Sequence, residues 1–129
     1  MAHIMLVDDE RDVTTLLKFL LERDGHRVSI ANDGAEALAK LGVEPAQTGA
    51  EVPDLIVLDV MMPVMDGFTV ASRLAQHDRM KQVPLIILTA KGEMRDLFQN
   101  ATNVATYLEK PFDPKNLREL IAGILAKKK

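Results

Sequence analysis

Near the middle of the chain, four consecutive apolar residues, Leu55 to Leu58, run directly into a carboxylate, Asp59. A short unbroken apolar run is typical of a strand that is buried on both faces of a parallel sheet. Open α/β sheets carry their functional groups at the carboxyl ends of the strands. The run therefore predicts a central strand, and Asp59 becomes a candidate functional carboxylate at the edge of a core.

Strand-like runs alternate with segments of helical periodicity along the whole chain. The other strand-like runs are 4–7, 28–31, 85–88 and the shorter 106–108. Helical patterns follow at 11–24, 35–41, 68–76, 93–99 and 114–125, the fourth with only a thin apolar stripe. Five alternations predict an α/β fold with one parallel sheet covered by helices on both faces. At 129 residues, we expect a single domain over residues 1–129.

Composition narrows the class of protein. The chain has no cysteine, which excludes disulfides and thiolate metal sites. A formal net charge of -3 argues against direct binding to nucleic acid. No apolar run approaches the roughly 20 residues needed to span a bilayer, and the N-terminal sequence lacks a signal-peptide pattern. These features are compatible with a cytoplasmic protein that contacts neither membrane nor nucleic acid.

Polar side chains stand at the carboxyl ends of four predicted strands. They are Asp8 with Asp9, then Asp59, Thr89 and Lys110. Because the carboxyl ends of parallel strands meet at one edge, we expect three carboxylates, a hydroxyl and an ammonium in one cleft. Singly, each residue has a structural alternative, since Asp suits turns and helix caps and the others suit an exposed surface. Their shared position at strand ends favours a functional site.

The expected cleft has a chemistry that follows from its charge. Clustered carboxylates repel one another, so they must take up protons or hold a cation. Oxygen ligands without Cys or a nearby His favour Mg²⁺, or a similar cation such as Mn²⁺, over Zn²⁺. A carboxylate beside such a metal can act as a nucleophile and form an acyl phosphate. Lys110 and Thr89 would then contact the phosphoryl oxygens.

These residues belong to a pattern that covers nearly the whole chain. The sequence resembles the receiver domain of bacterial two-component response regulators, of the chemotaxis-regulator type. The motifs that carry the resemblance are Leu6 to Glu10, Asn32 to Leu38, Pro53 to Asp59, Met61 to Gly67, Leu88 to Ala90 and Leu108 to Phe112. Each is weak alone, but their order and spacing together are specific. The resemblance implies a flavodoxin-like fold with five helices and the strand order 2-1-3-4-5.

The resemblance also assigns a role to each acidic candidate. Asp59 would accept a phosphoryl group from a phosphohistidine. The direct ligands of Mg²⁺ would be Asp9, Asp59 and the backbone carbonyl of Met61, with Asp8 acting mainly through water. On sequence alone, Met61 has a simpler interpretation as a packing residue.

A second set of residues would convert phosphorylation into a change of surface. Thr89 and Lys110 would hold the phosphoryl group, and Tyr107 matches the aromatic switch residue of the family. Thr89 would move inward, Tyr107 would follow it, and the surface of the last two strand–helix units would change its preferred partner. The Lys110–Pro111 peptide bond would be cis. On sequence alone, Tyr107 has a simpler interpretation as a core tyrosine with its hydroxyl satisfied.

The implied partners are a sensor histidine kinase or phosphotransfer protein upstream and a downstream effector of unknown kind. Homodimerisation on phosphorylation is a further expectation. Such a domain promotes its own phosphotransfer and dephosphorylation but is not a conventional turnover enzyme. The alternative function is a phosphorylation-independent interaction module, although such proteins typically lack a site residue and this chain has lost none. A dehalogenase-type hydrolase is disfavoured, because Met61 stands where its second Asp is needed.

Three remaining expectations concern features outside the motifs. The stretch from Gly42 to Pro53 is longer than receivers usually have there and is interpreted as a tolerated surface insertion. The stretch from Gln99 to Ala105 is slightly short for the family, which leaves the preceding helix and the mode of dimerisation open. His3, His26 and His77 have no ligand-like spacing and are expected to be solvated.

Overall fold

The computed structural model describes residues 2–44, 47, 49–60, 65–90, 104–110 and 112–127. Its elements are β1 (His3–Val7), α1 (Arg11–Arg23), β2 (Arg27–Ala31), α2 (Gly34–Lys40), β3 (Leu55–Asp59), α3 (Gly67–Ala75), β4 (Leu85–Ala90), β5 (Val104–Lys110) and α4 (Pro114–Lys127). The strands form one sheet in the order β2-β1-β3-β4-β5, and every neighbouring pair is parallel. This confirms the predicted flavodoxin-like fold. Four helices lie within the described residues, and the fifth, expected at 93–99, falls outside them.

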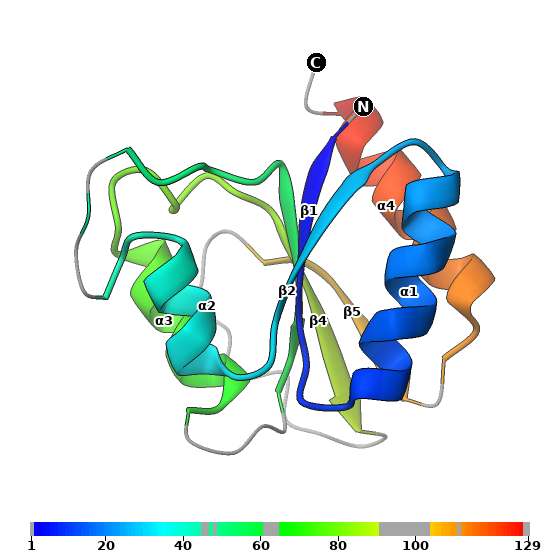
Figure 1. Ribbon diagram of the computed structural model, residues 1–129, viewed down its shortest axis with the longest axis horizontal. Coiled ribbons are helices and arrows are strands. Elements are labelled where there is room, and N and C mark those ends of the chain that lie inside the picture. Colours follow the sequence, from blue (N-terminus) through cyan, green and yellow to red (C-terminus); the bar gives the residue numbers. More distant parts are fainter. Residues whose placement is uncertain are drawn as a thin grey trace.

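The sheet lies between two layers of helices, with α1 and α4 on one face and α2 and α3 on the other (Figure 1). Neighbouring residues of a strand alternate between the two cores, as Leu6 and Val7 do. All five residues of β1 and of β3 are buried, which explains their unbroken apolar sequence. None of the described helices is long and apolar enough to cross a bilayer.

Local sequence signals set the helix starts. The Asp33 side chain accepts a hydrogen bond from the Glu36 amide at 2.8 Å, and Asp66 accepts one from the Thr69 amide at 2.8 Å. Each is the N-cap of its helix, where a short acceptor satisfies an otherwise unpaired amide. Asp113 accepts from the Lys115 amide at 2.9 Å, directly before Pro114 opens α4. These caps confirm the predicted starts to within one residue.

Strand β5 is longer than the apolar run in the sequence that predicts it. The sequence predicts a strand at 106–108, whereas β5 extends to Lys110, so that Ala90 pairs with Lys110. Val104 pairs with Leu85 and Thr106 pairs with Ile86, which leaves one extra residue in β5 as a bulge. Because alternation has a period of two, this extra residue decides which face each later side chain of β5 occupies.

The long connection before β3 is fastened to the domain by arginines. Arg73 of α3 forms an ion pair with Glu44, and the Arg79 guanidinium donates to the carbonyls of Gln47 and Ala50 at 3.0 Å each. Arg27 of β2 forms an ion pair with Glu51. The described part of the predicted insertion is therefore anchored on two sides.

His3 contradicts the expectation that the histidines are solvated. Its side chain is almost fully buried, and its Nε2 lies 2.8 Å from the Ser29 hydroxyl. The other ring nitrogen, Nδ1, lies 3.4 Å from a carboxylate oxygen of Glu51. His3 is the first residue of β1, and a central parallel strand is buried whatever the polarity of its side chains. The expectation of a solvated His3 rested only on the absence of ligand-like spacing, which says nothing about burial.

Candidate functional site

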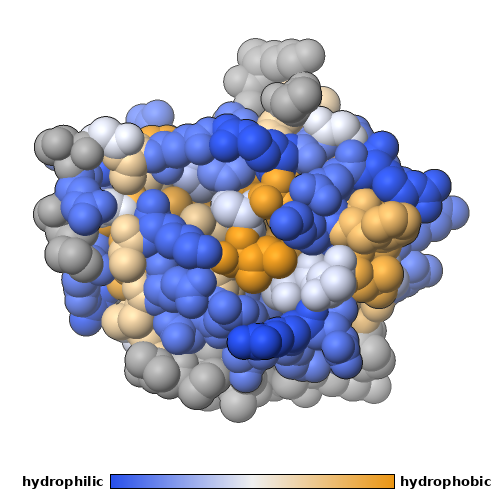
Figure 2. Space-filling model, viewed as in Figure 1, coloured by the Kyte–Doolittle hydropathy of each residue, from blue (hydrophilic) through white to orange (hydrophobic). Residues whose placement is uncertain are grey.

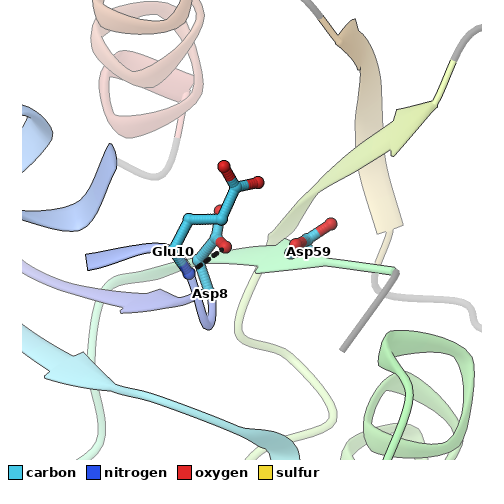
Figure 3. A group of neighbouring side chains, drawn as sticks. All are labelled: Asp8, Glu10 and Asp59. Atoms are coloured by element: carbon cyan, nitrogen blue, oxygen red, sulfur yellow. Dashed lines mark hydrogen bonds between the residues drawn. The ribbon is translucent and has the colours of Figure 1, made fainter. Parts of the chain in front are cut away.

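Three strand ends bring their charged side chains together at the carboxyl edge of the sheet. The Lys110 Nζ atom lies 3.0 Å from Asp59 Oδ2, 3.6 Å from Asp8 Oδ2 and 3.2 Å from Glu10 Oε1. Asp59 ends β3, Lys110 ends β5, and Asp8 and Glu10 follow β1. The Glu10 amide donates to Asp8 Oδ1 at 3.0 Å and fixes the turn between them, as Figure 3 shows. One ammonium thus serves three carboxylates from different parts of the chain.

Burial makes this arrangement electrostatically costly. The side chains of Asp8 and Asp59 are only 4% and 2% exposed. Burial, together with the nearby charge of Asp59, raises the pKa of Asp8 to about 6, although the amide of Glu10 and the charge of Lys110 act in the opposite direction. Burial also acts to lower the pKa of Lys110, but hydrogen bonds and charges from Asp59, Asp8 and Glu10 outweigh it and the pKa is raised. The single positive charge of Lys110 does not balance the three carboxylates of Asp8, Glu10 and Asp59.

The acidic group fits a divalent cation. Asp8, Glu10 and Asp59 each offer an oxygen, and these oxygens lie within 4.8 Å of one another. Asp8 Oδ2 is buried and makes no hydrogen bond to the described residues, and Lys110 Nζ lies 3.6 Å from it, so this oxygen can serve a cation as a ligand. An all-oxygen set of this kind suits Mg²⁺ or Mn²⁺. Asp9, one of the expected direct ligands, is exposed and does not belong to this group, whereas Glu10 does.

Thr89 and Tyr107, the residues expected to act in switching, lie on the face of the sheet that α2 and α3 cover. Tyr107 pairs with Ile87 in the sheet and packs against the core cluster on the side of α2 and α3. Thr89 is buried and lies two residues after Ile87, so alternation gives it the same face. Asp59 pairs with Leu88 and belongs to the opposite face by the same rule. The acidic group thus lies on the α1 and α4 side of the sheet, and Thr89 and Tyr107 lie on the α2 and α3 side. The two sets of residues meet at the carboxyl edge of the strands.

Two expectations fall on residues outside those described. They are the Met61 carbonyl as a metal ligand and the cis Lys110–Pro111 bond, which involve residues 61 and 111. The segment from 91 to 103, with the expected fourth helix, is also outside. Both expectations therefore stay predictions.

Sequence reasoning missed two residues that shape the site. Glu10 stands directly before the predicted helix at 11–24, where acids are favoured whatever else they do, so the sequence does not single it out. Gly67 enters the sequence argument only as the last residue of the motif Met61 to Gly67, with no role of its own. A Cβ atom at Gly67 would collide with the carbonyl oxygen of Asp59 and lie 2.8 Å from Val60 Cα, so α3 can approach the end of β3 only through a glycine. Its position directly after the N-cap Asp66 is the available signal, and it is a weak one.

The geometry agrees with comparisons to known proteins. The family model for the response regulator receiver domain matches residues 4–122. The chain is 43% identical over 123 residues to the alkaline phosphatase synthesis transcriptional regulatory protein PhoP of Bacillus subtilis, a match covering 95% of this chain and 48% of that protein. The chain spans about half the length of the curated relatives it matches. It therefore corresponds to one part of such regulators.

Solved structures of similar fold include two that contain magnesium. One is the response regulator TrrA of Thermotoga maritima in complex with Mg²⁺ and BeF, with a TM-score of 0.78 and 29% identity over 96% of this chain and 99% of that one. The other is the receiver domain of a Pseudomonas aeruginosa sensor histidine kinase with a magnesium ion in its active-site cleft, with a TM-score of 0.80 and 25% identity over 97% and 98% of the two chains. Together with the acidic group, they support binding of a divalent cation here. From its family match, its relatives and its fold, this chain belongs to the response regulator receiver domain family.

Proposed function

We propose that this chain is a phosphorylation-controlled switch in which Asp59 accepts a phosphoryl group from the phosphohistidine of a sensor kinase or phosphotransfer protein. The observation that carries the proposal is the contact of 3.0 Å between Lys110 Nζ and the buried carboxylate of Asp59. A carboxylate held at a strand end beside a fixed cation is positioned for attack on phosphorus. The relation of the chain to transcriptional regulators supports a role in signalling and, with it, a cytoplasmic location.

The chemistry is a transfer between two nucleophiles. An Asp59 oxygen forms a bond to phosphorus as the bond between phosphorus and the donor imidazole nitrogen breaks, and the electron pair of that bond stays with the imidazole. Mg²⁺, when bound, supplies positive charge that neutralises the phosphoryl oxygens. Lys110 is already at the acceptor oxygen and would transfer its contact to the incoming group. Asp8 and Asp59, with the expected ligands Asp9 and Met61, are the residues that would hold the cation, and Glu10 is the exposed member of the same acidic group.

Positioning and charge neutralisation are the main needs of phosphoryl transfer, and this site offers both. The chain would thus promote its own phosphorylation and dephosphorylation without acting as a conventional turnover enzyme. Thr89 and Tyr107 share one face of β4 and β5, which supports them as the pair that carries the change away from Asp59. The responding surface would be that of the last two strand–helix units, where a homodimer or an effector would bind.

An apolar groove beside the site supports a protein as phosphoryl donor. This groove, the α1–β5 groove, has a volume of about 430 Å³ and is lined by Glu10, Val13, Leu16, Leu17, Lys110, Phe112 and Pro114. Leu16 and Phe19 of α1 are 49% and 58% exposed, and apolar surface appears over α1 in Figure 2. Lys110 lines the groove and contacts all three carboxylates of the acidic group, so a kinase helix seated there would bring its phosphohistidine to Asp59.

The test uses beryllofluoride, which imitates a phosphoryl group on a carboxylate. With saturating Mg²⁺, titration of the wild-type chain should change the NMR signals of the Tyr107 ring, and Asp59→Asn should abolish that change. Asp54→Asn serves as the matched control, because Asp54 directly precedes β3, at the end of the strand away from Asp59. A silent Tyr107, or an equal response from Asp59→Asn, would contradict the proposal and favour a phosphorylation-independent interaction module.

A further inference from the structure

Glu10 has a side chain that the helix it precedes does not use. It is the N-cap residue of α1, yet its side chain makes no capping hydrogen bond. Acceptor side chains at this position normally bind an amide of the first helical turn. The carboxylate is instead directed to Lys110, with Glu10 Oε1 at 3.2 Å from Nζ. The side chain is 58% exposed, so the helix does not force this orientation by packing.

Glu10 also stands at the boundary between the buried site and the surface. Its oxygen lies within 4.8 Å of those of Asp8 and Asp59, and it lines the α1–β5 groove together with Lys110. Asp8 and Asp59 are buried, so the carboxylate of Glu10 is the exposed member of the acidic group (Figure 3). A phosphoryl group that approaches Asp59 along this groove therefore meets the negative charge of Glu10 first.

We propose that Glu10 is an electrostatic gate that shares the Lys110 ammonium with Asp59 and opposes the entry of free phosphoryl anions. Its carboxylate competes with the phosphoryl group for the same ammonium and adds one negative charge close to the acceptor. The gate disfavours small anionic phosphodonors in solution, whereas a protein docked in the groove can offset it with its own contacts. This inference rests on the proposed function and concerns a positioning residue that touches Lys110.

The effect of the gate is measurable as a dissociation constant. Two unit charges about 4 Å apart in water interact by an energy that corresponds to about a fivefold change in binding. In the presence of saturating Mg²⁺, Glu10→Gln should therefore bind beryllofluoride about fivefold more tightly than the wild-type chain, as measured by calorimetry. Labelling of Asp59 by acetyl phosphate should accelerate by a similar factor. Repeating the titration at doubled Mg²⁺ excludes a contribution from altered cation affinity.

Asp12→Asn is the matched control, because it removes the same charge from an exposed residue in the first turn of the same helix. This variant should bind beryllofluoride as the wild type does. Equal affinity of Glu10→Gln and wild type, weaker binding by Glu10→Gln, or an equal gain in Asp12→Asn would overturn the gate. If the wild-type chain binds no beryllofluoride at all, the proposed function fails as well, so the two failures are distinguishable.

Discussion

At the scale of single residues, Asp8 carries the charge that fits its surroundings least. Its pKa is raised from 3.8 to about 6, mainly by burial. Below about pH 4 the carboxyl group is protonated in both folded and unfolded chains, and between pH 4 and 6 only the folded chain keeps the proton. The stabilisation that the bound proton provides is therefore lost as the pH rises through 6. Near neutral pH, the metal-free chain holds a carboxylate that destabilises it.

This predicts that Asp8→Asn stabilises the metal-free protein at neutral pH. The difference between 3.8 and about 6 corresponds to about 3 kcal/mol, and we expect a gain of about 1–3 kcal/mol in the free energy of unfolding at pH 7. The gain should shrink toward zero at pH 4. Urea unfolding of both proteins in chelator at several pH values measures it. A variant that is less stable than wild type at pH 7 would show that the carboxylate is not under this strain.

At the scale of elements, the end of β3 is fixed by the helix that follows it. The Gly67 amide donates to the Val60 carbonyl at 2.9 Å, and no Cβ fits at Gly67 without a clash with Asp59 and Val60. Helix α3 thus presses directly on the backbone that carries the acceptor. The sequence predicted this helix at 68–76, but the contact between helix start and strand end depends on packing that no local pattern encodes.

We therefore expect Gly67→Ala to displace the end of β3. Overpacking of this kind typically costs about 1–3 kcal/mol, and beryllofluoride affinity should fall with it because Asp59 moves. Gly123→Ala in α4 is the control: a Cβ there meets no atom within 4 Å, and alanine should stabilise the helix by about 0.5–1 kcal/mol. Thermal unfolding and calorimetry on both variants measure these effects. Unchanged stability and affinity in Gly67→Ala would refute the close approach.

The strands show where sequence reasoning succeeds and where it stops. β1, β3 and β4 are buried runs whose apolar residues predict them directly, and these three place Asp8, Asp59 and Thr89. β5 was predicted too short, because Glu109 and Lys110 continue the ladder through backbone bonds that carry no side-chain signal. The bulge that sets its register is likewise invisible in the apolar pattern.

At the scale of the whole molecule, the parallel topology assembles the site. Asp8 and Asp59 come from neighbouring strands, and β4 separates Asp59 from Lys110. These residues could be predicted from the sequence, because each stands at the carboxyl end of a strand and the parallel topology brings those ends together. Glu10 and the exposed position of Asp9 did not follow, because the orientation of side chains in a turn depends on the charges opposite them. The sequence thus predicts the strand order and the residues at the strand ends, but it does not predict which side chains of the turn after β1 face the site.

The central claim is that Asp59 becomes phosphorylated, and intact-mass spectrometry tests it most directly. The wild-type chain is incubated with acetyl phosphate and Mg²⁺, alongside Asp59→Asn and a sample in which a chelator replaces Mg²⁺. We predict that the wild type alone gains the mass of one phosphoryl group, and that the group is lost at alkaline pH, as expected of an acyl phosphate. The same gain in Asp59→Asn, or no gain in the wild type, would contradict the account.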